Sequence, residues 1–234
     1  MLVRKISFFI TVCWSAIGSV AAPPLPPPSA ADVAKWEKAI AAFEKADASK
    51  PPPKDGILFI GSSSIRGWKT LTRDFPDQPV YNRGFGGSQI ADSRHFADRI
   101  VLPYRPRQIV MFAGSNDLNA GKSPAQVLAD YIAFTKLVHG QLPRTRISWI
   151  PITPCFKRWG QIERVRKANR LVAEYIATDA RLDYINTYDQ MLAPDGKPRP
   201  DIFQADGLHL NAEGYAIWTR IVRPFLGKNT DSKE

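Results

Sequence analysis

The chain has 234 residues, of which 44% are hydrophobic and 23% charged, a composition typical of a globular protein of one compact domain. Its formal net charge is +10, but the basic residues are scattered rather than clustered among aromatic residues. This pattern argues against a nucleic-acid-binding track and favours a solvated basic surface, with attraction to anionic polymers or membrane surfaces as the alternative.

Residues 1–21 have the pattern of a secretory signal peptide. Arg4 and Lys5 precede a short apolar stretch, residues 6–20, and the small pair Ala21–Ala22 follows. The apolar stretch is shorter than the roughly 20 residues of a membrane-spanning helix. We therefore expect cleavage and a periplasmic or secreted protein without stable membrane insertion. An uncleaved anchor is the alternative.

The two cysteines do not form a disulfide framework. Cys13 would leave with the signal peptide, so Cys155 would stand alone in an exported protein. Cys155 lies in Thr-Pro-Cys-Phe-Lys with no histidine nearby in sequence, which favours a structural role over a nucleophilic one.

Residues 22–30 read as a proline-rich spacer, residues 31–228 as the folded domain and residues 229–234 as a polar tail. Within the domain, short apolar strands alternate with amphipathic helices, and Asn211 is placed to cap the last helix. This alternation predicts a three-layer α/β/α fold around a flavodoxin-like parallel sheet of about five strands. The expected strands are 57–60, 80–81, 109–113, 147–152 and 182–185, and the expected helices are 31–48, 90–101, 124–137, 162–177 and 212–225.

Glycines and polar side chains are concentrated in four short segments. Gly61–Ser64, Gly84–Gly87 and Gly114–Asp117 each follow a predicted strand, and Asp206–His209 precedes the last predicted helix. In open parallel sheets, functional residues lie just beyond the carboxyl ends of the strands. We therefore expect these four segments to meet at one edge of the sheet.

Of the three histidines, His209 is the candidate general base. It follows Asp206 by three positions in a glycine-containing loop, where a turn can bring the carboxylate to the Nδ1–H group. His95 lies in a helical stretch and His139 lies beside Gly140 at a helix end, so both are interpreted as structural or surface residues. A solvated loop histidine is the alternative interpretation of His209.

The candidate nucleophile is one of three consecutive serines, Ser62, Ser63 and Ser64, at a strand-to-helix turn. A helix N-cap or a polar turn is the alternative. Acyl transfer also needs donors for a negative oxygen, and the backbone N–H of Gly87 and the amide of Asn116 are candidates. A flexible turn and an Asx-turn are the alternatives at these two positions.

In combination and order, the four segments resemble the sequence blocks of the SGNH hydrolases, the GDSL-like esterase and lipase family, from about residue 57 to residue 225. The Gly-Asp-Ser-Leu block corresponds to Gly61–Ser64, which makes Ser63 the nucleophile. Ser62 stands where the family has aspartate, a departure that concerns support of the loop more than catalysis. The remaining blocks correspond to Gly87, Gly114–Asp117 and Asp206–His209.

The resemblance implies a serine hydrolase that cleaves carboxylic esters through an acyl-enzyme. Ser63, His209 and Asp206 would form the triad, and the N–H groups of Ser63 and Gly87 with the Asn116 amide would form the oxyanion hole. No metal or organic cofactor is expected, and the substrate would be a small-molecule, glycan or lipid ester. A carbohydrate deacetylase-type esterase or a thioesterase on the same site is one alternative, and a catalytically silent carbohydrate- or surface-binding module is another.

Overall fold

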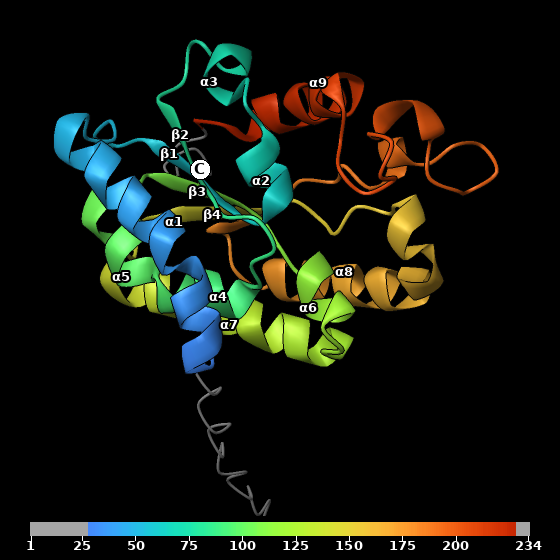
Figure 1. Ribbon diagram of the computed structural model, residues 1–234, viewed down its shortest axis with the longest axis horizontal. Coiled ribbons are helices and arrows are strands. Elements are labelled where there is room, and N and C mark those ends of the chain that lie inside the picture. Colours follow the sequence, from blue (N-terminus) through green and yellow to red (C-terminus); the bar gives the residue numbers. More distant parts are fainter. Residues whose placement is uncertain (1–27, 228–234) are drawn as a thin grey trace, which may run out of the picture.

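The computed structural model describes residues 28–227. The predicted signal peptide, residues 22–27 of the spacer and the polar tail lie outside the described residues. The described chain begins with a long helix, α1 (Ala30–Ser49), and the sheet follows from residue 57 onward (Figure 1). Within residues 28–227, no helix combines the length and apolarity needed to cross a membrane.

Five strands form one sheet, and every neighbouring pair is parallel. The spatial order is β2-β1-β3-β4-β5, which confirms the predicted flavodoxin-like sheet. Their bounds are β1 (Ile57–Gly61), β2 (Val80–Gly84), β3 (Gln108–Phe112), β4 (Arg146–Trp149) and β5 (Leu182–Tyr184).

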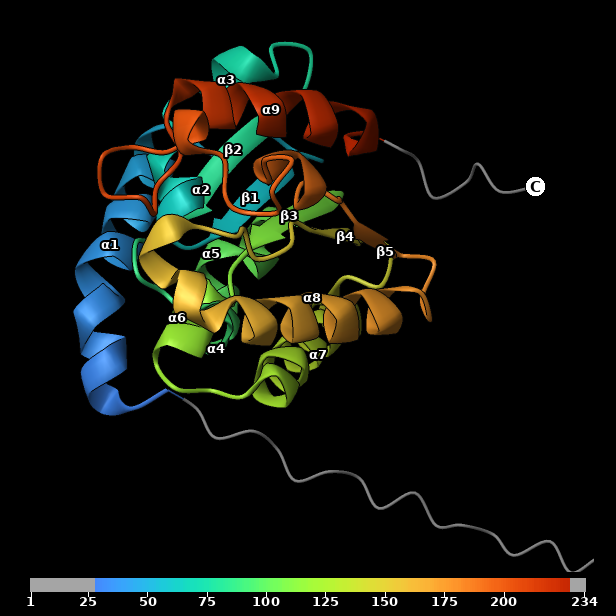
Figure 2. The ribbon, with the colours of Figure 1, turned by 90° about the vertical axis from the view of Figure 1, so that its right-hand side faces the viewer.

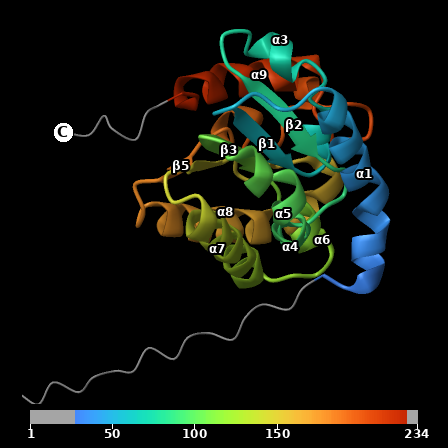
Figure 3. The same cartoon turned by 90° about the vertical axis from the view of Figure 1, so that its left-hand side faces the viewer.

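Helices cover both faces of the sheet and complete the three layers. Figures 2 and 3 show α3 and α9 on one side of the sheet and α7 and α8 on the other. The first layer contains α2 (Ser63–Gly67), α3 (Leu71–Asp74) and α9 (Ala212–Val222). The second contains α1, α4 (Ile90–His95), α5 (Ala97–Ile100), α7 (Pro124–Gln141) and α8 (Ile162–Ile176), with the short α6 (Ser115–Asn119) following β3.

The side-chain alternation of β1 explains why the sheet is covered twice. Leu58 and Ile60 enter the core beneath α7 and α8, whereas Ile57 and Phe59 enter the core beneath α2, α3 and α9. All four side chains are fully buried. A strand buried on both faces reads as a continuous apolar run, which is why the sequence predicted these strands.

Prolines explain where several element ends differ from the prediction. α7 continues beyond residue 137 and ends two residues before Pro143, and β4 ends two residues before Pro151 rather than at residue 152. The last helix changes to a 3-10 turn beside Pro224. Proline has no backbone N–H, so it cannot donate the next hydrogen bond of a helix or a strand. The predicted helix 90–101 is divided at Phe96, whose ψ of 7° is not helical.

Gly61 is the position where backbone geometry most tightly constrains the sheet edge. Its φ is +130°, and an added Cβ would lie 1.9 Å from the carbonyl oxygen of Phe112. That same oxygen accepts the N–H of Ser62 at 3.0 Å. A side chain here would therefore displace the residues that lead into α2.

Gly61→Ala is expected to lower the free energy of unfolding by roughly 2–4 kcal/mol, because it combines positive-φ strain with overpacking. Chemical denaturation measures this change. Gly160→Ala is the matched control, since no atom lies within 4 Å of its added Cβ, and it should change stability by no more than about 0.5 kcal/mol. Equal stability of the two variants would contradict the geometry described for Gly61.

Candidate active site

Ser63 begins α2 directly after β1. The carbonyl oxygen of Ser62 accepts the N–H groups of Ile65 and Arg66 at 3.1 Å, so the chain turns into a helix immediately after the strand. Tyr215 of α9 donates its hydroxyl proton to the carbonyl oxygen of Ser64 at 2.8 Å. This turn presents the Ser63 hydroxyl at the carboxyl edge of the sheet, as the sequence predicted.

Asp206 and His209 are joined within one tight loop. One carboxylate oxygen of Asp206 accepts the backbone N–H groups of Leu208 and His209, each at 3.0 Å. The other lies 2.5 Å from Nδ1 of His209. Gly207, between them, has a φ of +60°, which suits glycine. The loop therefore holds the imidazole by its Nδ1 side.

These hydrogen bonds fix the protonation pattern of the pair. They lower the pKa of Asp206 to about 2; the backbone N–H of His209 contributes most, and its side chain next. An ionised carboxylate only accepts hydrogen bonds, so Nδ1 of His209 carries the proton that lies between them. In the neutral imidazole Nε2 is then an unprotonated acceptor.

Nε2 of His209 lies 2.9 Å from Oγ of Ser63, although the two residues are 146 positions apart in sequence. The serine hydroxyl therefore donates to the histidine. The structure brings together all three residues that the sequence proposed as a triad.

The three candidate oxyanion donors lie on separate segments that follow β1, β2 and β3 at the same edge of the sheet. Among residues 28–227, the backbone N–H groups of Ser63 and Gly87 donate to no acceptor. Asn116, the second residue of α6, donates from Nδ2 to the carbonyl oxygen of Ser88 at 3.0 Å, which leaves its second amide proton free. Trp36 of α1 lies against Gly87, 3.1 Å from where a Cβ would stand.

A small cavity adjoins Ser63. Its wall contains several serines and the side chains of Phe112, Asn116, Thr153, Cys155, Arg158, Leu208 and Leu210. The Thr153 hydroxyl is buried and has no hydrogen-bond partner among the described residues. Polar and apolar side chains therefore both line the cavity beside the nucleophile.

Arg158 was not identified from the sequence. Its guanidinium donates to the side-chain oxygen of Asn116 at 3.0 Å and to Oγ of Ser115 at 2.7 Å. These contacts cross more than 40 positions and belong to no compact motif, so no pattern in the sequence indicated them.

The other potentially reactive residues have structural surroundings. His139 contacts the carbonyl oxygen of Thr145 through Nε2 at 3.0 Å, and burial lowers its pKa. His95 is exposed and packs edge-on against Phe96. Cys155 is a buried free thiol whose pKa is raised by burial, which disfavours the nucleophilic thiolate. Within residues 28–227, no group of three His, Cys, Asp or Glu side chains could hold a metal ion.

A family model, that of the GDSL-like Lipase/Acylhydrolase family, matches residues 58–217. The chain belongs to this family. The matched region contains all the candidate site residues from Ser63 to His209. Family membership makes the chain a hydrolase of the ester-cleaving type and indicates small-molecule substrates. No curated protein matches the chain.

Solved structures of low sequence identity share the fold. A Streptococcus pneumonia protein named for platelet activating factor has a TM-score of 0.73 and 21% identity, over 84% of this chain and 95% of that one. A GDSL-like lipase from Bacteroides thetaiotaomicron has a TM-score of 0.66 and 18% identity, over 80% and 96%. The lipase/acylhydrolase from Enterococcus faecalis has a TM-score of 0.60 and 21% identity, over 76% and 100%. At these identities the likeness establishes the architecture.

The pKa of Asp206 tests the loop geometry directly. In the wild type, NMR titration of this carboxyl should give a value of about 2. In His209→Ala the pKa should rise toward, without reaching, the ordinary value of about 3.9, because the two backbone N–H donors remain. A pKa lowered by folding means that the contact stabilises the fold above about pH 4 and that this contribution is lost as pH falls toward 2.

The control for this titration is His139→Ala, which removes a histidine remote from the loop and should leave the Asp206 pKa unchanged. An unchanged value in His209→Ala would contradict the side-chain contact between Asp206 and His209.

Proposed function

We propose that the protein is a serine hydrolase that cleaves carboxylic esters through an acyl-enzyme intermediate. The observation that carries this proposal is the 2.9 Å contact between Oγ of Ser63 and Nε2 of His209, with Asp206 on the opposite ring nitrogen. A serine hydroxyl is a weak nucleophile until a base removes its proton, and this arrangement supplies an oriented base.

In the proposed reaction, Oγ of Ser63 attacks the ester carbonyl carbon while its proton passes to Nε2 of His209. Asp206 stabilises the resulting imidazolium through Nδ1–H. The negative oxygen of the tetrahedral intermediate accepts from Ser63 N–H, Gly87 N–H and the free amide proton of Asn116. When the intermediate collapses, the bond to the alcohol oxygen breaks and His209 returns the proton to the alcohol. Water then attacks the acyl-enzyme by the same steps and releases the acid.

The cavity supports a short acyl group in this reaction. The cavity is small, and its wall includes the polar Ser62, Ser115 and Thr153 together with the apolar Phe112, Leu208 and Leu210. A cavity of this size has room for a short acyl group and none for a long hydrocarbon chain. This observation favours the deacetylase-type alternative on the same site, in which the acyl group is acetyl and the leaving group is a hydroxyl of a carbohydrate. A thioester would react by the same steps.

Covalent labelling of serine variants tests the nucleophile. Ser63→Ala should abolish labelling by a fluorophosphonate and lower ester hydrolysis by at least about 10⁴-fold, because the attacking oxygen is gone. Ser62→Ala and Ser64→Ala are matched controls from the same turn and should keep labelling and measurable activity. The substrate panel should vary acyl length and alcohol, and include acetylated sugars, lysophospholipids and thioesters.

If labelling persists in Ser63→Ala and disappears in Ser62→Ala or Ser64→Ala, the nucleophile is that other serine and the proposed role of Ser63 is wrong. A wild-type protein that neither reacts with the probe nor hydrolyses any ester in the panel would instead support the silent binding module.

The proposal includes export to the periplasm or the exterior, supported by the sequence of residues 1–21. Mass spectrometry of the protein recovered from its expressing cell should show a chain beginning near residue 22. An intact Met1 in the membrane fraction would indicate an anchor instead.

A further inference from the structure

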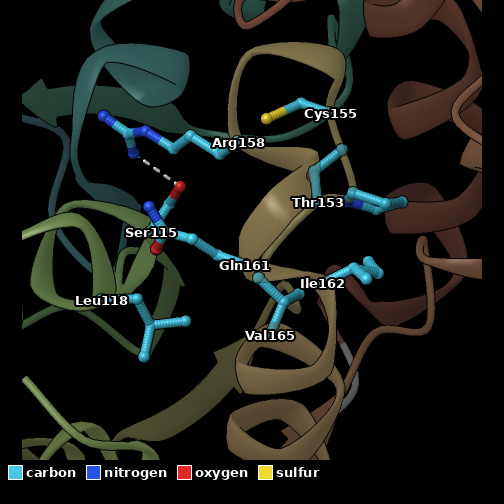
Figure 4. A pocket seen from close by; sticks show the side chains of 9 residues that line it. Ser115, Leu118, Thr153, Cys155, Arg158, Gln161, Ile162 and Val165 are labelled. Carbon is cyan, nitrogen blue, oxygen red and sulfur yellow. Dashed lines mark hydrogen bonds between the residues drawn. The ribbon is translucent and has the colours of Figure 1, made fainter.

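Arg158 reaches the active site from a segment distant in sequence. It lies in a 3-10 stretch, Phe156–Gln161, that follows β4 and precedes α8. Its two terminal nitrogens divide between adjacent residues at the start of α6: Nη1 donates to Ser115 and Nη2 to Asn116. Figure 4 shows the side chain extended from this stretch toward Ser115, with the hydrogen bond drawn.

The charge of Arg158 is not balanced by a carboxylate. The side chain is half-buried, and no acidic group in residues 28–227 forms an ion pair with it. Burial lowers the pKa of its guanidinium. Two other arginines whose side chains have little exposure have acidic partners: Arg83 pairs with Asp47 and Arg146 with Asp183. Desolvating a cation without a counter-ion is costly, so Arg158 is poorly explained as a stabilising residue.

The contacts of Asn116 determine what Arg158 does. The amide oxygen accepts from Arg158, and one amide proton is donated to the carbonyl oxygen of Ser88. Because the amide group is planar, fixing these two partners also fixes the direction of the second proton. A flipped amide would place its NH₂ group against the guanidinium and its oxygen against the Ser88 carbonyl, and both contacts would be repulsive. Arg158 and Ser88 therefore permit one orientation only.

We propose that Arg158 is a positioning residue for the oxyanion hole: it holds the Asn116 amide so that its free proton faces the tetrahedral oxygen at Ser63. The positive charge also polarises the amide and strengthens that proton as a donor. This inference rests on the proposed acyl-enzyme mechanism. Arg158 acts through Asn116, without contact to the reacting atoms.

The chemistry of the contact requires arginine. The acceptors are two side-chain oxygens on consecutive residues, Ser115 and Asn116, and a planar guanidinium can donate to both at once. The ammonium group of lysine carries the same charge on a flexible chain. It does not reproduce the planar pair of donors with which the guanidinium reaches both oxygens. Arg158→Lys should therefore have a lower kcat than the wild type.

A double-mutant cycle between Arg158 and Asn116 tests this coupling. Asn116→Ala should lower kcat by roughly 100-fold or more, with little change in KM, since its donor acts mainly in the transition state. Arg158→Ala should lower kcat by roughly 10- to 100-fold, also with little change in KM. The double variant should be no slower than Asn116→Ala alone, because Arg158 has nothing left to position. Added guanidinium ion should partly restore kcat in Arg158→Ala.

Melting temperatures are measured on the same preparations, so that kcat refers to folded protein. Arg158→Met, which keeps an unbranched apolar stem without donors, serves if Arg158→Ala does not fold. Arg166→Ala is the matched control: this nearby arginine is exposed and pairs only with Glu163 among carboxylates of the described chain. It should retain wild-type kinetics.

Three results would overturn the inference. They are an unchanged kcat in Arg158→Ala, a raised KM with kcat intact, and equal slowing by Arg158→Ala in the wild-type and Asn116→Ala backgrounds. If one of these results is found and activity still depends on Ser63, the role of Arg158 is wrong and the proposed function is not contradicted. A protein whose ester hydrolysis is insensitive to Ser63→Ala contradicts the proposed function itself.

Discussion

The site depends on one hydrogen bond, from Oγ of Ser63 to Nε2 of His209, which joins the end of β1 to the loop before α9. The packing between α2 and α9 holds these two segments at that distance. The ring of Trp68, just after α2, stacks on Tyr215 with centroids 5.4 Å apart and lies 5.8 Å from that of Trp218. Tyr215 also donates its hydroxyl proton to the carbonyl oxygen of Ser64. Helix α9 therefore fixes the position of the turn that carries the nucleophile.

The oxyanion side of the site is supported from the other layer. Asp117, next to Asn116, is fully buried; it accepts the N–H of Ile90 at 3.3 Å and contacts Lys122 at 3.2 Å. Lys122 also pairs with Asp130 of α7 at 2.6 Å. Burial raises the pKa of Asp117, and the Lys122 charge opposes that effect. This network ties α6 to α4 and α7, so the Asn116 backbone is fixed independently of its side-chain contacts.

The sequence was informative wherever a feature is local. Apolar runs predicted the strands because both faces of this sheet are buried, and the Asp-x-x-His spacing indicated a contact that one turn can close. The choice of Ser63 over its serine neighbours required the family resemblance, because all three hydroxyls occupy the same turn. Arg158 escaped detection because its contacts with α6 depend on how two loops pack. The break at Phe96 also depends on tertiary context, which periodicity does not encode.

The acylated residue is the most direct test of the account. The protein should be mixed with a slowly hydrolysed ester, quenched in acid within the first turnover and digested for mass spectrometry. The account predicts that the acyl mass is found on Ser63 and that it disappears as the acid product accumulates. An adduct on Ser62, Ser64 or Cys155, or a burst of alcohol with no acylated peptide, would contradict it.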